Sequence, residues 1–325
     1  MLDFSEDFFQ EEKVCDFTIS KMMKRAWAAQ IEVVTEIARV CNQLGVRYFA
    51  DFGTLLGTIR HQGFIPWDDD LDICMLRSDY NRFLSEAPAL LEPWFELKSV
   101  YNDPTYDIVK ARVINGRHMN FDREFLERFH NCPYAVGVDI FVIDDVPNNK
   151  KDLDTLVESL TFLLKVEASI PESEPYDNDV MELMKQIEDT YKVTIDYNNR
   201  LRHEVKKIYD ILSAKYLDVD VEKVGCMMGL CMKQGGFIYD KNDFEVLEMM
   251  PFENIFLPVP KCYKEILVSN YGEDYMTPIN IGASHDYPFY KDQTQGLKEV
   301  MEREFKTVLT DEMMEQLIEM KIMGA

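Results

Sequence analysis

The stretch that decides the fold of this chain is GTLLGTIRHQGFIPWDDDLDICML, residues 53–76. It begins with a turn that contains glycines, continues into four aspartates within five positions and ends in an apolar run. Residues 71–76 alternate in character, which predicts a strand with one face in the core. Apolar residues also precede the aspartates. The acidic run is therefore wedged against the core and is not a free surface tail.

This acidic run permits three interpretations. A solvated turn is the ordinary one, but the flanking apolar residues argue against it. A calcium loop that starts at Asp68 would need Gly at its sixth position and Glu at its twelfth, where the chain has Ile73 and Asp79. That interpretation is excluded. A catalytic magnesium site remains, because hard oxygen ligands on a rigid strand are typical of phosphoryl-type transfer.

The period of an extended chain divides the acidic residues into two groups. If the run is extended, Asp68, Asp70 and Asp72 project to one face and Asp69 points away from it. Carboxylates on one face repel each other unless a cation neutralises them. Asp139, in the apolar run VGVDIF, is the candidate ligand from a neighbouring strand, because an isolated acid in a buried strand is costly unless it is paired or bound to metal.

Composition and charge exclude several classes of function. The chain has 325 residues and a net charge of -24, which argues against a general nucleic-acid grip or a polybasic hold on lipid. Its seven cysteines form no CxxC pair and are expected to be reduced. The sequence has no recognisable signal peptide and no transmembrane segment. We therefore expect a cytoplasmic protein that has no nucleic-acid partner.

The remaining pattern predicts an α+β fold, in which a mixed sheet flanked by helices is followed by an added helical region. We expect a catalytic core over residues 1–149, a helical region with an acceptor-site or lid role over 150–240, and a segment packing back on the core over 241–325. The expected helices are residues 20–45, ending at Gly45, a short one after Gly53, one that opens at a Ser78 cap, and most of 150–235, 297–308 and 312–323. The expected strands are residues 46–51, 71–76, 95–101, 106–114, 118–122 and 136–147, with a hairpin or extended segment near 250–260.

Four segments together resemble the LicD/fukutin family. They are DFGTLLGTIRHQGFIPWDDDLDICMLRSDYNRF (51–83), KAR (110–112), VDIFVIDDVP (138–147) and LPVPKCYKEILVSNYGEDYMTPI (257–279). The combination is long and ordered, and it is far more specific than a lone DxD. The resemblance covers most of residues 20–150 and a segment near 255–285, and it implies the fold of the nucleotidyltransferase superfamily.

The resemblance also implies a reaction. Members of the family transfer a phospho-alcohol, typically phosphocholine from CDP-choline, to a sugar hydroxyl with Mg²⁺, and CMP leaves. Mn²⁺ is an alternative metal. The expected partners are a CDP-alcohol donor and a glycan or lipid-linked sugar acceptor, such as a cell-surface polysaccharide or teichoic acid, with peripheral membrane contact. Alternative donors carry ribitol phosphate, glycerol phosphate, phosphoethanolamine or aminoethylphosphonate.

The implied site combines a metal cluster with a phosphate cradle. Asp70, Asp72 and Asp139 would hold the metal and include the catalytic base, with Asp68 as a further ligand. The glycines would allow backbone to approach a phosphate, and the amides opening the short helix would point at it. The candidate donor-binding residues are Gly53, Thr54, Gly57, Arg60, Lys110 and Arg112.

Three questions stay open at the level of sequence. A quaternary ammonium group would rest against aromatic rings, and Trp67, Tyr80 and Tyr134 are candidates. His285 follows the segment 257–279 where the family often has a histidine. Two other functions also remain: transfer of NMP from an NTP, and glycan binding by an inactive version of the fold.

Overall fold

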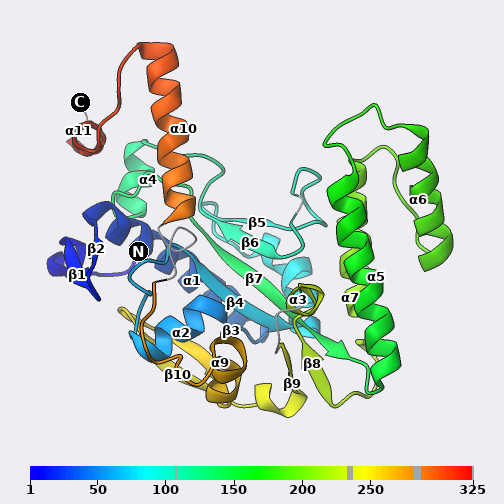
Figure 1. Cartoon of the computed structure of the whole chain (residues 1–325). Coiled ribbons are helices and arrows are strands. Elements are labelled where there is room, and N and C mark those ends of the chain that lie inside the picture. The colour runs from blue at the N-terminus through cyan, green and yellow to red at the C-terminus, as the bar shows by residue number, and fades with distance from the viewer. Residues whose placement is uncertain (107, 233–236, 281–286, 324–325) are drawn as a thin grey trace.

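The computed structural model describes residues 1–325 except 107, 233–236, 281–286 and 324–325. It is an α+β protein in which helices surround a mixed sheet, and a group of helices, α5 to α7, stands to one side (Figure 1). The strands are β1 (Glu12–Val14), β2 (Phe17–Ile19), β3 (Phe49–Ala50), β4 (Leu71–Leu76), β5 (Glu96–Lys98), β6 (Ala111–Ile114), β7 (Gly137–Val146), β8 (Lys223–Gly225), β9 (Ile238–Asp240), β10 (Leu247–Phe252) and β11 (Ile255–Pro260). The α-helices are α1 (Lys21–Leu44), α2 (Phe52–Arg60), α3 (Arg77–Glu86), α4 (Arg123–Arg128), α5 (Lys150–Ser169), α6 (Asn178–Tyr191), α7 (Leu201–Ser213), α8 (Met227–Cys231), α9 (Tyr263–Tyr271), α10 (Pro288–Phe305) and α11 (Asp311–Met323).

The first long helix confirms the prediction for residues 20–45. The Ser20 side chain accepts a hydrogen bond from the Met23 N–H at the N-terminus of α1, and Gly45 ends the helix with a left-handed φ of 66°. Its apolar stripe is buried, with Trp27, Ile31 and other residues in the main core cluster. The helix packs against β6 and β7 and so forms the layer behind the strands that carry the acidic residues.

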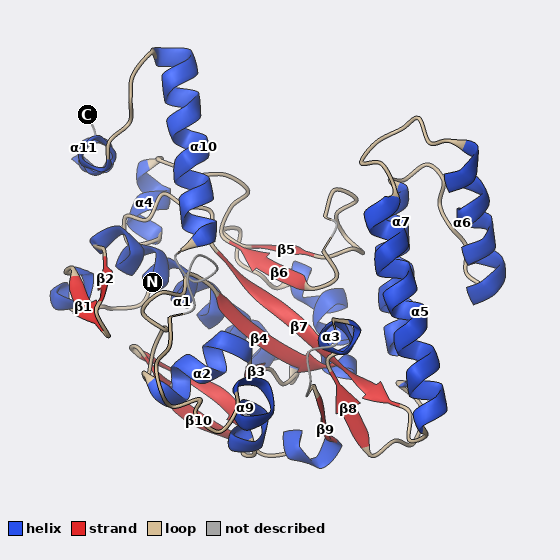
Figure 2. Ribbon diagram, viewed as in Figure 1, coloured by secondary structure: helices blue, strands red, loops and turns tan. Residues whose placement is uncertain are grey.

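The main sheet has the order β3-β4-β7-β6-β5, with β8 and β9 added along the end of β7. β4 and β7 run parallel, whereas β3 pairs with β4, and β6 with β7, in antiparallel fashion. Figure 2 shows β4 and β7 side by side across the middle of the sheet. The run 136–147 predicted as a buried strand is β7, which is confirmed, and the predicted hairpin near residue 255 is formed by β10 and β11.

Three local predictions were wrong. Residues 118–122 are a loop, and the Asn120 N–H donates to the Pro133 carbonyl. Ser78 does not cap α3, which begins one residue earlier, after Leu76. The described residues of the segment 180–235 are helical only in part, because β8 pairs with the end of β7 and extends the sheet.

The helical region has its own hydrophobic cluster. Residues from α5, α6 and α7 pack together with Val146, Met227 and Cys231. Arg77 of α3 links this region to the sheet, because its guanidinium lies 2.6 Å from Asp144 of β7 and 3.0 Å from Asp210 of α7. The predicted boundaries near residues 149 and 240 stay predictions.

The C-terminal helices return to the N-terminal half of the chain. On α10, the Gln293 side chain accepts from the Ala135 N–H at 3.0 Å and donates to the Ala135 carbonyl at 2.9 Å. On α11, Glu315 lies 2.8 Å from Arg25 of α1. None of the helices in the described part of the chain combines the length and apolarity that crossing a bilayer requires.

Candidate active site

The candidate site lies where two parallel strands bring carboxylates together. Asp72 of β4 pairs in register with Asp139 of β7, so both side chains project to the same face of the sheet. Asp70, just before β4, adds a third carboxylate. One carboxylate oxygen from each of the three residues lies within 4.8 Å of the other two. The structure thus brings together Asp70, Asp72 and Asp139, although their role as metal ligands stays a prediction.

Two of these carboxylates have a buried oxygen with no hydrogen-bond partner among the described residues. They are Asp72 Oδ1 and Asp139 Oδ1, and of these Asp139 Oδ1 has an ion pair of 3.3 Å with Arg112 Nε, whereas no polar contact is found for Asp72 Oδ1 in the described part of the chain. A buried carboxylate oxygen without a donor is costly, and a bound cation would remove that cost. Mg²⁺ and Mn²⁺ prefer oxygen ligands of this kind. The residues present therefore fit a divalent cation.

The raised pKa values of two clustered carboxyl groups also indicate a site that suits a cation. Burial raises the pKa of Asp72 well above its ordinary value, and the charges of Asp70 and Asp139 raise it further, whereas Lys110 lowers it. Burial also raises the pKa of Asp68 well above its ordinary value, with Asp70 as the next cause. A divalent cation among these groups would favour their charged forms and reverse both effects.

Two predicted phosphate contacts are paired with Asp139. Lys110 Nζ lies 2.5 Å from Asp139 Oδ2, and Arg112 Nε lies 3.3 Å from Asp139 Oδ1. The cause is the sheet register, since β6 is the antiparallel neighbour of β7 and Arg112 pairs with Asp139. Both cations therefore balance and orient a carboxylate of the cluster. A contact of either one with phosphate stays a prediction.

The turn between β3 and α2 fits closely around the acidic run. Phe52 has a positive φ of 46°, and its N–H donates to Asp51 Oδ1 at 2.8 Å. A Cβ on Gly53 would lie 2.6 Å from Asp68 Oδ2, so only glycine leaves room for that carboxylate. The Thr54 hydroxyl accepts a hydrogen bond of 2.7 Å from the Asp72 N–H. Gly53 and Thr54 thus position two of the acids.

Gly57 has a different environment from Gly53. A Cβ at this position would lie 2.5 Å from the Gly63 carbonyl oxygen. The missing side chain therefore allows α2 to pack closely on the backbone of the following turn. This contact accounts for the glycine without a ligand, and the predicted phosphate contact of Gly57 stays a prediction.

The strand period predicted that Asp69 points away from the other acids, and this prediction was wrong. One of its carboxylate oxygens lies within 4.8 Å of oxygens of Asp68 and Asp70, because β4 begins only at Leu71 and the alternation does not extend back to Asp69. Its Oδ2 accepts a hydrogen bond of 3.0 Å from the Tyr290 N–H in the first turn of α10. Burial raises the pKa of Asp69 to about 6 against the effect of this hydrogen bond. Asp69 therefore connects α10 to the acidic cluster.

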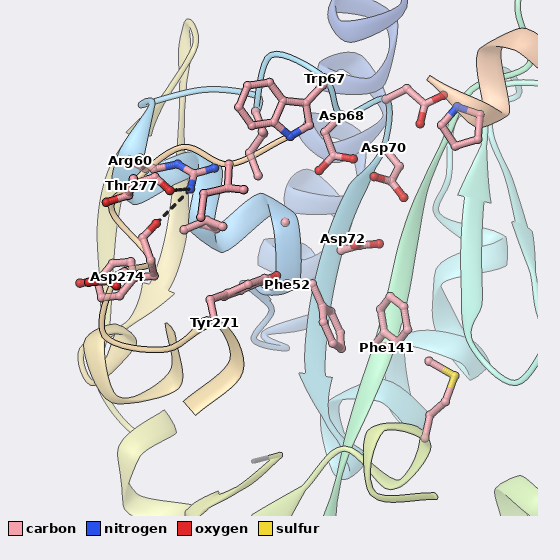
Figure 3. Close-up of a pocket in the computed structure, with 18 residues that line it drawn as sticks. Phe52, Arg60, Trp67, Asp68, Asp70, Asp72, Phe141, Tyr271, Asp274 and Thr277 are labelled. Carbon is pink, nitrogen blue, oxygen red and sulfur yellow. Dashed lines mark hydrogen bonds between the residues drawn. The ribbon is translucent and has the colours of Figure 1, made fainter. Parts of the chain in front are cut away.

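A cavity of about 510 Å³ opens beside the acids (Figure 3). Its wall includes Gly53, Asp68, Asp70 and Asp72 on one side and Arg60 on another. Arg60 Nη1 donates to the carbonyl oxygens of Tyr275 at 3.0 Å and Thr277 at 3.4 Å, which fixes the segment after α9 against α2. The cavity thus presents carboxylates and a guanidinium to one volume, as a metal-bound diphosphate requires.

The part of the chain that carries the clustered acids matches a known protein family. Residues 45–145 match the family described as LicD/FKTN/FKRP, nucleotidyltransferase domain. This range contains β3, β4, β6 and most of β7, together with all three clustered acids. Residues 45–145 are a domain of the LicD/fukutin family.

Curated relatives match over parts of their length. The chain is 35% identical over 121 residues to the lipopolysaccharide cholinephosphotransferase LicD of Haemophilus influenzae, a match that covers 37% of this chain and 43% of that protein. It is 42% identical over 67 residues to the uncharacterized protein RT0683 of Rickettsia typhi, covering 21% of this chain and 22% of that protein. It is 56% identical over 48 residues to RP689 of Rickettsia prowazekii, covering 15% and 18%. Each match spans less than half of the relative.

The cavity also contains aromatic residues that could not be predicted from the sequence. Phe52, Phe141 and Tyr271 line it, as does the predicted candidate Trp67. The other two candidates, Tyr80 and Tyr134, are each 2% exposed and belong to the core, and His285 lies outside the described residues. The missed rings lie in the segments that carry the family resemblance. Nothing in their spacing separates them from core residues.

Proposed function

We propose that this protein transfers a phospho-alcohol from a CDP-activated donor to a hydroxyl of a cell-surface glycan or its precursor and releases CMP. Phosphocholine is the group we favour, since the curated relative with a named activity is a lipopolysaccharide cholinephosphotransferase. The observation that carries the proposal is the cluster of Asp70, Asp72 and Asp139 beside a cavity of about 510 Å³.

The cluster would hold Mg²⁺, with Mn²⁺ as an alternative. Asp70, Asp72 and Asp139 supply the oxygen ligands, and Asp68 is positioned beside them by Gly53. The buried Asp72 Oδ1, which has no hydrogen-bond partner among the described residues, supports this assignment. When bound, the cation would neutralise charge on the donor's diphosphate and on the leaving CMP.

The chain's own groups would orient the donor and receive a proton. Arg60 lies in the cavity wall and would pair with a phosphate oxygen, because a guanidinium provides several fixed donors. An acceptor hydroxyl would attack the phosphorus that carries the alcohol, forming a new O–P bond as the bond to CMP breaks. A carboxylate of the cluster would take the hydroxyl proton.

The acceptor and the cellular setting are part of the same proposal. We propose that residues 150–240 shape the acceptor side of the site and that residues 241–325 complete the donor side, because Tyr271 and Asp274 line the cavity. The acceptor would be a glycan or a lipid-linked sugar, reached from the cytoplasm with peripheral membrane contact.

The proposal is tested by identifying the product released. The purified chain is incubated with Mg²⁺, a glycan acceptor fraction and each of CDP-choline, CDP-ethanolamine, CDP-ribitol and CDP-glycerol. We expect CMP release with CDP-choline, no release without metal, and loss of release in Asp72→Asn. Asp154→Asn serves as the control, because Asp154 forms an exposed ion pair with Lys150.

Other outcomes would contradict the proposal. Pyrophosphate release from an NTP would indicate a nucleotidyltransferase. Failure of the chain to bind either the metal or any CDP-alcohol in calorimetry would favour a non-catalytic glycan-binding protein.

A further inference from the structure

The wall of the cavity next to Asp72 is aromatic. The rings of Phe52 and Phe141 lie 4.6 Å apart between centroids, at 52° to each other. Tyr271, the last residue of α9, extends into the cavity toward Phe52 from the other side (Figure 3). These three rings come from three elements distant in sequence. We call Phe52, Phe141 and Tyr271 the aromatic wall.

The chemistry of the aromatic wall restricts what it can bind. The phenylalanine rings offer no hydrogen-bonding atom, and Tyr271 offers one hydroxyl. A nucleobase can stack on such rings, but this wall offers the polar atoms of its edge only the Tyr271 hydroxyl as a partner. A quaternary ammonium group has no N–H to satisfy and gains from contact with the faces of aromatic rings.

The charges around the aromatic wall also favour a cation. Asp72 and Asp68 line the same cavity. Burial raises the pKa of the Tyr271 hydroxyl, the carboxylates of Asp51, Asp72 and Asp68 raise it further, and Arg60 lowers it. The phenol is therefore neutral, and three carboxylates and one guanidinium act on it.

Besides Arg60, a second cation lies near this wall. Lys110 Nζ is 4.6 Å from the centroid of the Phe141 ring, but it is ion-paired with Asp139 at 2.5 Å. Lys110 is not part of the cavity lining, whereas Phe141 is. The charge of Lys110 is thus balanced by Asp139, outside the volume that a ligand would fill.

We propose that the aromatic wall binds the trimethylammonium group of a choline-bearing donor and selects it over a primary amine. This inference rests on the proposed function and names the recognition element of that site. The side of the cavity that faces Phe52 and Phe141 also contains Arg60, Asp274 and Thr277 beyond Tyr271, and these polar groups suit the nucleotide portion (Figure 3). A primary ammonium carries three N–H donors that Phe52 and Phe141 cannot satisfy, so ethanolamine should bind more weakly.

The test compares two donors on matched variants. Binding of CDP-choline and CDP-ethanolamine is measured by calorimetry with Mg²⁺ for the wild type, Phe52→Leu, Tyr271→Leu and Tyr271→Phe. Leucine keeps an apolar side chain and removes the π-face. We expect Phe52→Leu and Tyr271→Leu to weaken CDP-choline binding about three- to thirtyfold, with little effect on CDP-ethanolamine.

Two further variants guard the interpretation. Tyr271→Phe retains the ring and should retain the preference for choline. Phe256→Leu, on the outer face of the β10–β11 hairpin where Phe256 is 61% exposed, should behave as wild type. Tyr271 is itself 43% exposed, so Tyr271→Leu should fold even if Phe52→Leu does not.

The outcomes separate this inference from the proposed function. Equal binding of both donors by the wild type, or an equal loss for both donors in the leucine variants, would overturn the aromatic wall as the choline subsite and leave the transferase intact. Absence of binding by every CDP-alcohol would overturn both.

Discussion

At the scale of single residues, Gly53 is a position where adding one methyl group should disturb the acidic cluster directly. A methyl group there would lie 2.6 Å from Asp68 Oδ2, so the carboxylate would have to move. We expect Gly53→Ala to lower metal-dependent turnover about tenfold or more, because displacing a positioned group by about 1 Å can have that effect. The rate is measured at several Mg²⁺ concentrations.

Gly296→Ala provides the matched control for that prediction. Gly296 lies in α10, and nothing lies within 4 Å of a Cβ built on it. Alanine there should leave turnover unchanged and stabilise the helix by about 0.5–1 kcal/mol. If both variants retained full turnover, Gly53 would not position Asp68 for the reaction.

Thr54 makes a second prediction at this scale. Its hydroxyl accepts the Asp72 N–H at 2.7 Å, and Thr54→Val would leave that buried N–H without a partner. We expect a loss of about 1–3 kcal/mol in the free energy of unfolding and a lower kcat. Thr54→Ser keeps the hydroxyl and should restore kcat. A serine variant as impaired as valine would show that methyl packing matters more than the hydrogen bond.

At the scale of elements, long periodic segments could be predicted and short pairings could not. The apolar stripe of α1 and the apolar run of β7 allowed both elements to be predicted, because many residues repeat one period. β8 and β9 have three residues each, too few to establish a period, and they are strands because β7 extends far enough to pair with β8. The shared face of Asp70 and Asp72 could be predicted from strand period, and the proximity of Asp139 from its place as an isolated acid in a buried strand. The role of Asp69 could not, since it depends on a helix more than 200 residues away.

A buried ion pair between α1 and α4 gives a pH prediction. Glu32 lies 2.7 Å from Arg128 and 2.9 Å from His130. Burial would raise the pKa of Glu32, but hydrogen bonds from His130, Arg128 and the Leu2 amide lower it to about 2. The folded pKa is therefore below the unfolded one, so this stabilisation is present above about pH 4.5 and is lost as the pH falls toward 2.

The variant Glu32→Gln should show this dependence. We expect it to lower the free energy of unfolding by about 2 kcal/mol at pH 7 and by much less near pH 3, as measured by denaturant titration. Glu127→Gln, which removes an exposed pair on α4, should change stability by less than about 0.5 kcal/mol at both values. A pH-independent loss in Glu32→Gln would contradict the assignment.

At the scale of the whole molecule, Arg77 links the helical region to the sheet. Its guanidinium is buried between Asp144 and Asp210, and the Tyr101 hydroxyl donates to Asp210 at 2.6 Å. The sequence showed no motif in residues 150–235, because a single buried arginine and two distant acids form no local pattern. This contact is a tertiary feature that only the structure reveals.

Arg77→Met should therefore weaken the coupling between the helical region and the main sheet. Two carboxylates would be left buried without their cation, which costs about 3–5 kcal/mol. We expect faster hydrogen exchange in α7 than in β4, as measured by mass spectrometry. Arg82→Met on the same helix removes an exposed pair with Glu86 and should leave exchange unchanged. Equal acceleration in α7 and β4 would mean that the chain unfolds as one unit.

The central claim is that Asp70, Asp72 and Asp139 hold a divalent cation, and a calorimetric Mg²⁺ titration tests it most directly. The wild type should bind the metal, and its affinity should rise with pH, because the raised pKa values of Asp68 and Asp72 make protons compete with the cation. Asp72→Asn should abolish binding, whereas Asp154→Asn should not alter it. Equal Mg²⁺ binding by the wild type and Asp72→Asn, or no binding by either, would contradict the account.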